Sequence, residues 1–274
     1  MSRTTRLYIV SGNEYPDLTT QQGGSRMGWL LLLIAPVIGS FIGVLVRRWP
    51  DAHGIVFGRS RCEHCAQHLS PAEIIPLLSF LWLRGRCRQC GSPIDPFHPM
   101  IECAALAVAV CACAMRGINN PFVAGDCVLG WALLTLACID LRHWRLPDML
   151  TLPLILLGMG EAIWLDPATL LWPRVTGIVV AYGALALLGL LYRLLRGREG
   201  LGAGDAKLFA AGAAWTGLTA LPGILLLAAL GGLIHAAIRA FRGSRFSRHT
   251  AIPFGPALAA AIWIVRLLMF QDIE

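Results

Sequence analysis

Charged side chains are scarce in this chain of 274 residues, because Asp, Glu, Lys and Arg together make up only 14% of it. A soluble domain carries roughly a quarter charged residues, so the composition excludes an ordinary soluble protein. Hydrophobic residues account for 56% of the sequence, and the mean hydropathy is +0.64. The sequence therefore predicts an all-α, polytopic membrane protein.

Lysine is almost absent as well. Lys207 is the only lysine, and all other residues in the combined count of 23 lysines and arginines are arginine. The formal charge of +7 and the pI near 9.2 would suit a nucleic-acid-binding protein. However, the arginines gather at the ends of apolar runs, as the positive-inside rule expects for a membrane protein. We therefore expect the lipid bilayer as a partner and no nucleic acid.

Apolar runs recur along the chain at lengths suited to a hydrocarbon core about 30 Å thick. They predict about eight transmembrane helices, near residues 28–47, 100–116, 122–140, 149–165, 173–193, 205–217, 221–240 and 252–270. Residues 1–27 show neither a helical period nor the pattern of a signal peptide. We interpret them as a disordered tail, with Met27 as an alternative start.

Arginine counting orients the predicted helices. The ends of the first, third, fifth and seventh spans carry arginines at positions 47 and 48, 142 and 145, 193, 196 and 198, and 239, 242, 245 and 248. The connections on the other side carry only Arg116 and Arg174. The arginine-rich ends are therefore expected on the cytoplasmic side of a multi-pass membrane protein, together with the polar loop at about 48–99.

Four cysteines in this loop form two pairs, Cys62 with Cys65 and Cys87 with Cys90, separated by 21 residues. Two residues between cysteines let both thiolates of a turn face one metal, and two such turns complete a tetrahedral site. The spacing predicts a structural zinc in a small zinc-ribbon-like domain that has too little core to fold alone. The alternative is two reduced thiol pairs without a metal.

Two aspartates end or begin predicted spans on the cytoplasmic side. Asp140 follows the apolar run 131–139, and Asp205 lies in the hexamer Gly-Ala-Gly-Asp-Ala-Lys at 202–207. Two carboxylates in one low-dielectric site cannot both ionise easily, so one holds a proton while the other activates water. This arrangement suits acid–base peptide hydrolysis. The alternative is a pair of helix-terminal carboxylates without chemistry.

The residues around Asp205 also carry expectations. Gly202 and Gly204 would allow unusual dihedral angles and the close approach of a substrate strand. Lys207 would either bias Asp205 toward its ionised form or anchor the helix by snorkelling. Asp148 follows a proline and would cap the next helix.

Four other ionisable residues have structural interpretations. Asp126 precedes Asp140 by 14 residues, roughly 21 Å along a helix, and so lies near the outer face. For Glu73 and Glu102 we expect solvation or a local ion pair, and for His235 a packed position in the core.

In their order along the chain, these motifs resemble the type 4 prepilin peptidases, the leader peptidases of type IV pilus and type II secretion systems. The resemblance covers about residues 36–257, at Gly39–Pro50, Arg61–Cys65, Glu73–Ser79, Arg84–Cys90, Ile139–Asp148, Gly202–Leu208 and Ile252–Pro256. It implies a GxGD-type aspartic protease of the bacterial inner membrane, multi-pass, with catalytic Asp140 and Asp205. Members cleave prepilins and pseudopilins on the cytoplasmic side, after the glycine that ends the basic leader.

The resemblance also implies a second activity. Many members methylate the new N-terminus with S-adenosylmethionine, and the cysteine-bearing loop marks these longer members. Residues 28–99 would then form a methyltransferase-type region and residues 100–274 the peptidase domain. Gly43 and Ile74 stand where such members commonly have asparagine, so a peptidase without methyl transfer stays open as an alternative.

Two other functions also stay open. One is a methyltransferase or zinc-dependent scaffold whose aspartates are structural. The other is a transporter whose carboxylates carry protons, although acidic groups near the middle of the bilayer would suit it better. The sequence assigns neither residues to the methyl donor nor an oligomeric state.

Overall fold

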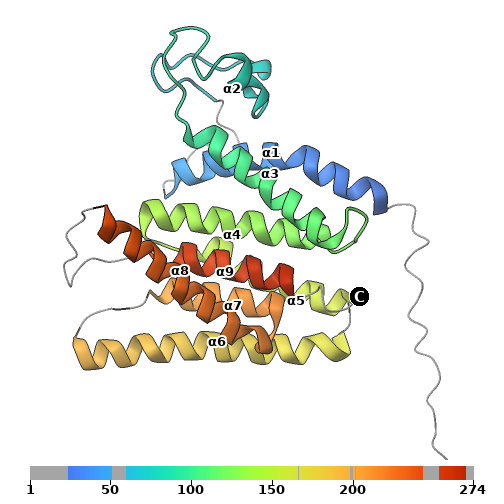
Figure 1. The fold of residues 1–274 in the computed structure, drawn as a ribbon, viewed down its shortest axis with the longest axis vertical. Helices are drawn as coiled ribbons and strands as arrows, with labels where there is room; N and C mark the ends of the chain where they lie inside the picture. The colour runs from blue at the N-terminus through green and yellow to red at the C-terminus, as the bar shows by residue number, and fades with distance from the viewer. Residues whose placement is uncertain are drawn as a thin grey trace, which may run out of the picture.

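Figure 1 shows the computed structural model, which describes residues 24–50, 60–165, 167–197, 200, 202–242 and 253–269. Within these ranges the regular structure is helical, and strand pairing is limited to two single bridges, Arg61 with His68 and Arg86 with Pro93. The apolar helices lie side by side in one bundle. The segment with the short helix α2 projects from the bundle beyond α1 and α3 (Figure 1).

The predicted helices are present among the described residues, with small shifts of their ends. The helices are α1 (Gly24–Arg48), α2 (Leu78–Trp82), α3 (Phe97–Arg116), α4 (Val123–His143), α5 (Asp148–Leu165), α6 (Pro167–Arg196), α7 (Ala203–Thr216), α8 (Leu221–Phe241) and α9 (Gly255–Leu268). The short 3-10 helices η2 (Pro71–Ile74) and η3 (Leu218–Ala220) precede α2 and α8. The predicted all-α class is thus confirmed. Residues 1–23 of the predicted tail lie outside the described residues, and α1 includes the remaining four.

Six of the described helices are long and apolar enough to cross a membrane, namely α1, α3, α4, α5, α6 and α8 with its preceding turn. The other two of the eight predicted spans correspond to α7 and α9, which are shorter, with 14 residues each. The chain is a multi-pass membrane protein. Large apolar side chains such as Trp29, Leu194 and Leu226 remain more than half exposed on the outside of the bundle. Apolar surface on this scale is typical of helices that face lipid.

Helix α7 occupies the centre of the bundle. Ten of its fourteen residues are buried, as expected for a helix that is apolar on all sides. It packs against α5, α6 and α9. Its many Ala and Gly residues allow close approach, since a Cβ on Gly212 would lie only 2.7 Å from Ile262 of α9.

The buried residues form two cores that meet at α4. One core joins α4 to α7, α8 and α9, and the other joins α4 to α1 and α3. Helix α8 contributes little to either core, because its buried side chains are only Leu221, Ile224 and Ala228. His235 lies on the exposed part of α8. The prediction that His235 packs in the core was therefore wrong.

Candidate active site

The structure brings the two predicted aspartates to one cavity. Asp140 and Asp205 both line a cavity of about 490 Å³ at the ends of α4 and α7. The other lining residues come from the end of α1, from the α4–α5 connection and from the start of α5 and α7: Trp49, Trp144, Arg145, Leu146, Pro147, Asp148, Met149, Gly202, Ala203 and Gly204. Paired carboxylates in such a cavity are able to activate a water molecule.

Asp140 lies in the last turn of α4 and is only 7% exposed. The backbone N–H of Gly255, the first residue of α9, donates a hydrogen bond to its carboxylate. The partial positive charge of a helix N-terminus favours an anion at this place. A Cβ on Gly255 would lie 2.6 Å from Oδ2 of Asp140, so the close approach of α9 requires glycine here.

Asp205 lies in the first turn of α7, three residues after Gly202, which caps the helix. The N–H of Asp205 donates to the carbonyl of Gly202 at 3.1 Å, and the N–H of Gly202 donates to the carboxylate of Asp205. Each aspartate is thus held at the N-terminus of a helix, Asp140 by α9 and Asp205 by its own helix.

The two glycines of the hexamer differ from the prediction. Gly202 has φ −71° and ψ 139°, extended angles that any residue adopts, so the expected unusual dihedral angles are wrong. A Cβ there would lie 3.3 Å from Oδ2 of Asp205, and a Cβ on Gly204 would lie 2.9 Å from Cβ of Leu146. The glycines therefore make room, Gly202 for the carboxylate and Gly204 for the α4–α5 connection.

The ion-pair partner of Lys207 is Asp148 and not Asp205. Its Nζ lies 2.7 Å from both carboxylate oxygens of Asp148, and this ion pair joins the starts of α5 and α7. Neither role predicted for Lys207 had included this contact, and both stay predictions. The capping prediction for Asp148 missed the contact as well, because a lysine 59 residues away lies outside any local pattern.

Two residues that donate hydrogen bonds to Asp140 had no role predicted from the sequence. Gly255 belongs to a motif of the resemblance, but no local rule connects it to Asp140. Trp144 ends α4 with a left-handed φ of 56°, and its N–H donates to the carbonyl of Asp140 at 2.9 Å. A non-glycine residue with positive φ is strained and often lies at a functional site. No sequence signal indicates this conformation.

The four loop cysteines come together as predicted. Their Sγ atoms all lie within 4.8 Å of one another, and Sγ of Cys62 is 3.8 Å from Sγ of Cys90. Thiolates around a tetrahedral zinc, at a Zn–S distance of about 2.3 Å, lie roughly 3.8 Å apart. The donor set and its spacing fit one such metal.

The backbone repeats the same turn at both pairs. The N–H of Ala66 donates to the carbonyl of Cys62 at 3.0 Å, and the N–H of Gly91 donates to that of Cys87 at 2.9 Å. Ala66 and Gly91 both have positive φ, at 57° and 68°. Two equivalent turns that face each other are the arrangement of a zinc ribbon.

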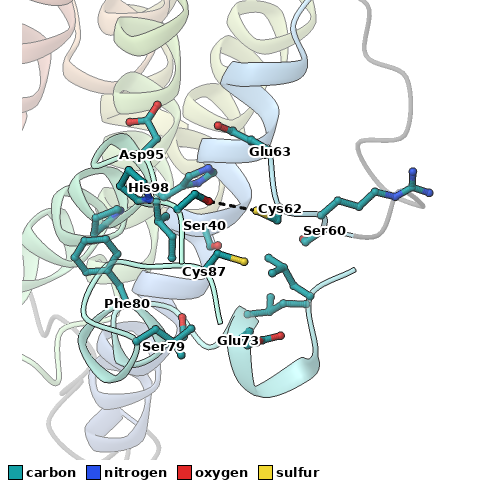
Figure 2. A pocket seen from close by; sticks show the side chains of 18 of the residues that line it. Ser40, Ser60, Cys62, Glu63, Glu73, Ser79, Phe80, Cys87, Asp95 and His98 are labelled. Carbon is teal, nitrogen blue, oxygen red and sulfur yellow. Dashed lines mark hydrogen bonds between the residues drawn. The ribbon is translucent and has the colours of Figure 1, made fainter. Parts of the chain in front are cut away.

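A second cavity, of about 630 Å³, lies between this loop and helices α1 and α3 (Figure 2). Four carboxylates line it, from Glu63, Glu73, Asp95 and Glu102. Glu102 is 6% exposed and accepts hydrogen bonds from the N–H of Leu77, at 2.8 Å, and from Ser40. Glu102 therefore ties the loop to α3. The sequence had predicted only solvation or a local ion pair for this residue.

Other carboxylates of this cavity are held by local contacts. Glu73 caps η2 by accepting from the N–H of Ser70 at 2.7 Å, and this bond lowers the pKa of Glu73. The N–H of Phe97 donates to Asp95 at 2.8 Å and lowers the pKa of Asp95, with help from the positive charge of Arg47. Arg47 of α1 pairs with both Asp95 and Glu63, so α1 holds the loop over the cavity.

Gly43 and Ile74, the two positions at which the resemblance leads us to expect asparagine, lie near this cavity. Ile74 is 43% exposed and lines it. Gly43 faces α3, where a Cβ would lie 3.2 Å from Ile101 and 3.5 Å from Nδ1 of His98. The packing of α1 on α3 therefore leaves little room for a larger side chain at position 43.

Comparison with known proteins assigns the family. Residues 33–116 match the bacterial peptidase A24 N-terminal domain, and residues 127–237 match the type IV leader peptidase family. The chain belongs to the type IV leader peptidase family. The first match includes the four cysteines, and the second includes Asp140 and Asp205. The resemblance seen in the sequence is confirmed.

Several relatives that are named prepilin leader peptidase/N-methyltransferase match most of this chain. The protein from Burkholderia pseudomallei (strain K96243) is 38% identical over 256 residues, which are 84% of this chain and 81% of the relative. Those from Aeromonas hydrophila and Dichelobacter nodosus are 38% and 33% identical, and each match covers 89% of the relative and 87% or 86% of this chain. No solved structure matches the chain.

Proposed function

We propose that this chain is an aspartic endopeptidase of the bacterial inner membrane that removes the basic leader of type IV prepilins or pseudopilins after a glycine. We further propose that it methylates the new N-terminus with S-adenosylmethionine. The observation that carries the peptidase proposal is the meeting of Asp140 and Asp205 at one cavity. The printed names of the relatives support both activities.

The geometry supports an acid–base mechanism. One of the two carboxylates takes a proton from water as the water oxygen attacks the scissile carbonyl, and the other donates a proton to the carbonyl oxygen. The tetrahedral intermediate then collapses, the C–N bond breaks, and the leaving amine takes up a proton. The N–H groups of Gly255 and Gly202 hold the two carboxylates in place during these transfers.

The charge pattern supports a cytoplasmic location for this chemistry. Arg145 lines the cavity, and α6 and α8 end at the same side with Arg193, Arg196 and Arg239. Arginine at one end of alternate helices marks the cytoplasmic side.

We propose that the four cysteines hold a structural zinc ion. Four thiolates leave no open position for water, so the ion would contribute folding energy to the loop and no catalytic step. Cys62, Cys65, Cys87 and Cys90 would be the ligands.

The cavity beside this loop suits the methyl transfer. Its volume of about 630 Å³ lies within the range of roughly 300–1,000 Å³ for small-molecule sites. Its four carboxylates share the wall with four arginines, Arg47, Arg48, Arg61 and Arg88, and a carboxylate there is able to accept the proton that an amine loses on methylation. S-adenosylmethionine would supply the methyl group there. The apolar Ile74 in the wall favours the alternative of a peptidase that has lost this activity.

Mass spectrometry of a prepilin-like peptide tests both activities. The peptide is incubated with purified protein in detergent, with and without S-adenosylmethionine. We expect loss of the leader in both samples and a gain of one methylene only with the methyl donor. Cleavage without methylation would support the peptidase-only alternative, and methylation of cleaved peptide without cleavage of precursor would support the scaffold alternative.

Aspartate variants test the site. Asp140→Asn and Asp205→Asn should each abolish leader removal. Asp148→Asn is the matched control, because Asp148 lines the same cavity but pairs with Lys207. Full processing by either of the first two variants would contradict the assignment, and proton flux in liposomes without cleavage would favour a transporter.

A further inference from the structure

A cluster of buried charges lies far from the cavity with the aspartates, where the opposite ends of the helices meet. It consists of Arg116, Asp126, Glu161, Arg174 and Arg266. Asp126 is fully buried, and Arg266 and Arg174 are only 1% and 2% exposed. A buried ion pair is weak evidence for stability, because desolvation offsets much of the attraction, so a role in specifying geometry is the better explanation.

Arg266 of α9 binds three other helices with its three nitrogens. Nε donates to Asp126 of α4 at 2.8 Å, Nη1 to the carbonyl of Trp215 in α7 at 2.7 Å, and Nη2 to Glu161 of α5 at 2.6 Å. The carbonyl of Trp215 belongs to the last turn of α7, where backbone acceptors lack a partner within the helix. One guanidinium therefore fixes the ends of α4, α5 and α7 together.

Two of these helices carry the aspartates at their other ends. On α4, Asp140 follows Asp126 by 14 residues, about 21 Å along the helix. On α7, Asp205 precedes Trp215 by ten residues, about 15 Å. Helix α9 contacts the same pair at its start, because Gly255 donates to Asp140. It thus touches α4 at both ends and α7 at the end remote from Asp205.

Helix α9 also packs against α4 and α7 along its length (Figure 1). A glycine on each neighbour receives a side chain of α9. A Cβ on Gly130 of α4 would lie 2.9 Å from Trp263, and a Cβ on Gly212 of α7 would lie 2.7 Å from Ile262. Helix α9 therefore serves as the common reference for the other two helices.

We infer that α9 sets the position of Asp205 relative to Asp140, and that Arg266 is the positioning residue that locks α7 along its axis. The inference rests on the proposed peptidase function. The side chains of α7 itself bond to α5, through Nε1 of Trp215 on the carbonyl of Leu154 and through Lys207 on Asp148. Arg266 is the side chain that ties the end of α7 to α9 and, through Asp126, to α4, the helix that carries Asp140. A displacement of about 1 Å in a catalytic group is enough to cost roughly 100-fold in rate.

The test compares two arginine-to-lysine variants. Arg266→Lys keeps the charge, but one ammonium cannot replace three separate N–H contacts, so the bond to Trp215 is lost. Arg174→Lys is the matched control, since Arg174 is equally buried in the same cluster and binds Gly158 and Glu161 but not α7. Both proteins are assayed for cleavage of a prepilin-like peptide, and their folding is checked by gel filtration in detergent.

We expect the kcat of Arg266→Lys to fall about 10- to 100-fold, with KM within about twofold of the wild type. The pH profile of kcat should also change in width, because the interaction between two carboxylates depends on their separation. For Arg174→Lys we expect kcat within about threefold and an unchanged profile, because α7 keeps its lock. A loss of folding alone would change neither KM nor the shape of the profile.

A second variant covers the case in which Arg266→Lys does not fold. Asp126→Asn keeps an oxygen for Nε of Arg266 but removes one charge. We expect its kcat to fall about three- to tenfold and its pH profile to change in width, as for Arg266→Lys. Wild-type kcat and profile in the folded variants, or equal losses in Arg174→Lys, would overturn the inference. A wild-type protein that fails to cleave the peptide would instead overturn the proposed peptidase function.

Discussion

Gly255→Ala should separate catalysis from stability. The added Cβ would lie 2.6 Å from Oδ2 of Asp140, and ordinary contact begins at 3.4 Å. The oxygen therefore has to move by about 0.8 Å. The carboxylate is the end of a side chain and can rotate away, so α9 keeps its place while Asp140 loses its position.

The size of the effect follows from this displacement. A shift of about 1 Å in a catalytic group costs roughly 100-fold in rate, which is about 2.7 kcal/mol of transition-state stabilisation. The hydrogen bond from the N–H of Gly255 to the carboxylate is strained by the same movement. We expect kcat to fall about 100-fold and the thermal unfolding midpoint to change little.

The assay is steady-state cleavage of a prepilin-like peptide, with thermal unfolding measured on the same samples. Gly160→Ala is the matched control, since Gly160 lies inside α5 and an added Cβ meets nothing within 4 Å. Alanine is favoured over glycine in a helix by about 0.8–1.0 kcal/mol, so this variant should be active and slightly more stable. If Gly255→Ala cleaves within threefold of the wild-type rate, α9 does not hold Asp140 in the way described.

Three further predictions concern the loop that carries the four cysteines and the ion pair of Lys207. We expect about one zinc ion per chain in the wild type, and Cys62→Ser should lower this content and reduce stability before it reduces peptide cleavage. Metal analysis that finds no zinc in folded wild-type protein would contradict this prediction. The pKa of Asp95 lies below its ordinary value of 3.8 because the N–H of Phe97 donates to its carboxylate. The ionised carboxylate therefore stabilises the folded loop above pH 3.8, and this stabilisation is lost as the pH falls through the lowered pKa. Acid unfolding should therefore begin at higher pH in Asp95→Asn, as followed by tryptophan fluorescence, and identical curves would refute it. Lys207→Gln breaks a half-exposed ion pair with Asp148 that is worth about 0–1 kcal/mol; kcat should stay within about threefold, and a loss like that of the aspartate variants would show that the lysine acts in the chemistry.

The sequence predicted the elements of the fold well because the bilayer restricts them strongly. A run of about 20 apolar residues has to be helical in lipid. The cysteine spacing was equally informative, since two CxxC turns, as in Cys62–Cys65, suit one tetrahedral metal. These signals are local, and each is complete within one stretch of chain.

The contacts between helices were not predictable in the same way. Lys207 and Asp148 are 59 residues apart, and Arg266 and Asp126 are 140 apart. Periodicity predicts which residues form a helix but not which helices are neighbours or how far each is shifted along its axis. The position of Asp126 near the outer end of α4 was predictable from helix length. Its partner on α9 was not.

The length of α7 bears on how the substrate reaches the aspartates. Its 14 residues extend about 21 Å, less than the hydrocarbon thickness of about 30 Å. Its far end is joined through Arg266 and Asp126 to Arg116, the last residue of α3. In the proposed orientation, with the aspartates toward the cytoplasm, Asp205 would be recessed below the membrane surface, at the cavity of about 490 Å³. A peptide bond inside a helix has its carbonyl engaged, so a substrate that is helical at the scissile bond would have to unwind there before cleavage. We therefore expect alanines that strengthen the helix around the scissile bond to slow cleavage, while paired glycines there speed it; equal kcat/KM for the two peptides would show that unwinding is not required.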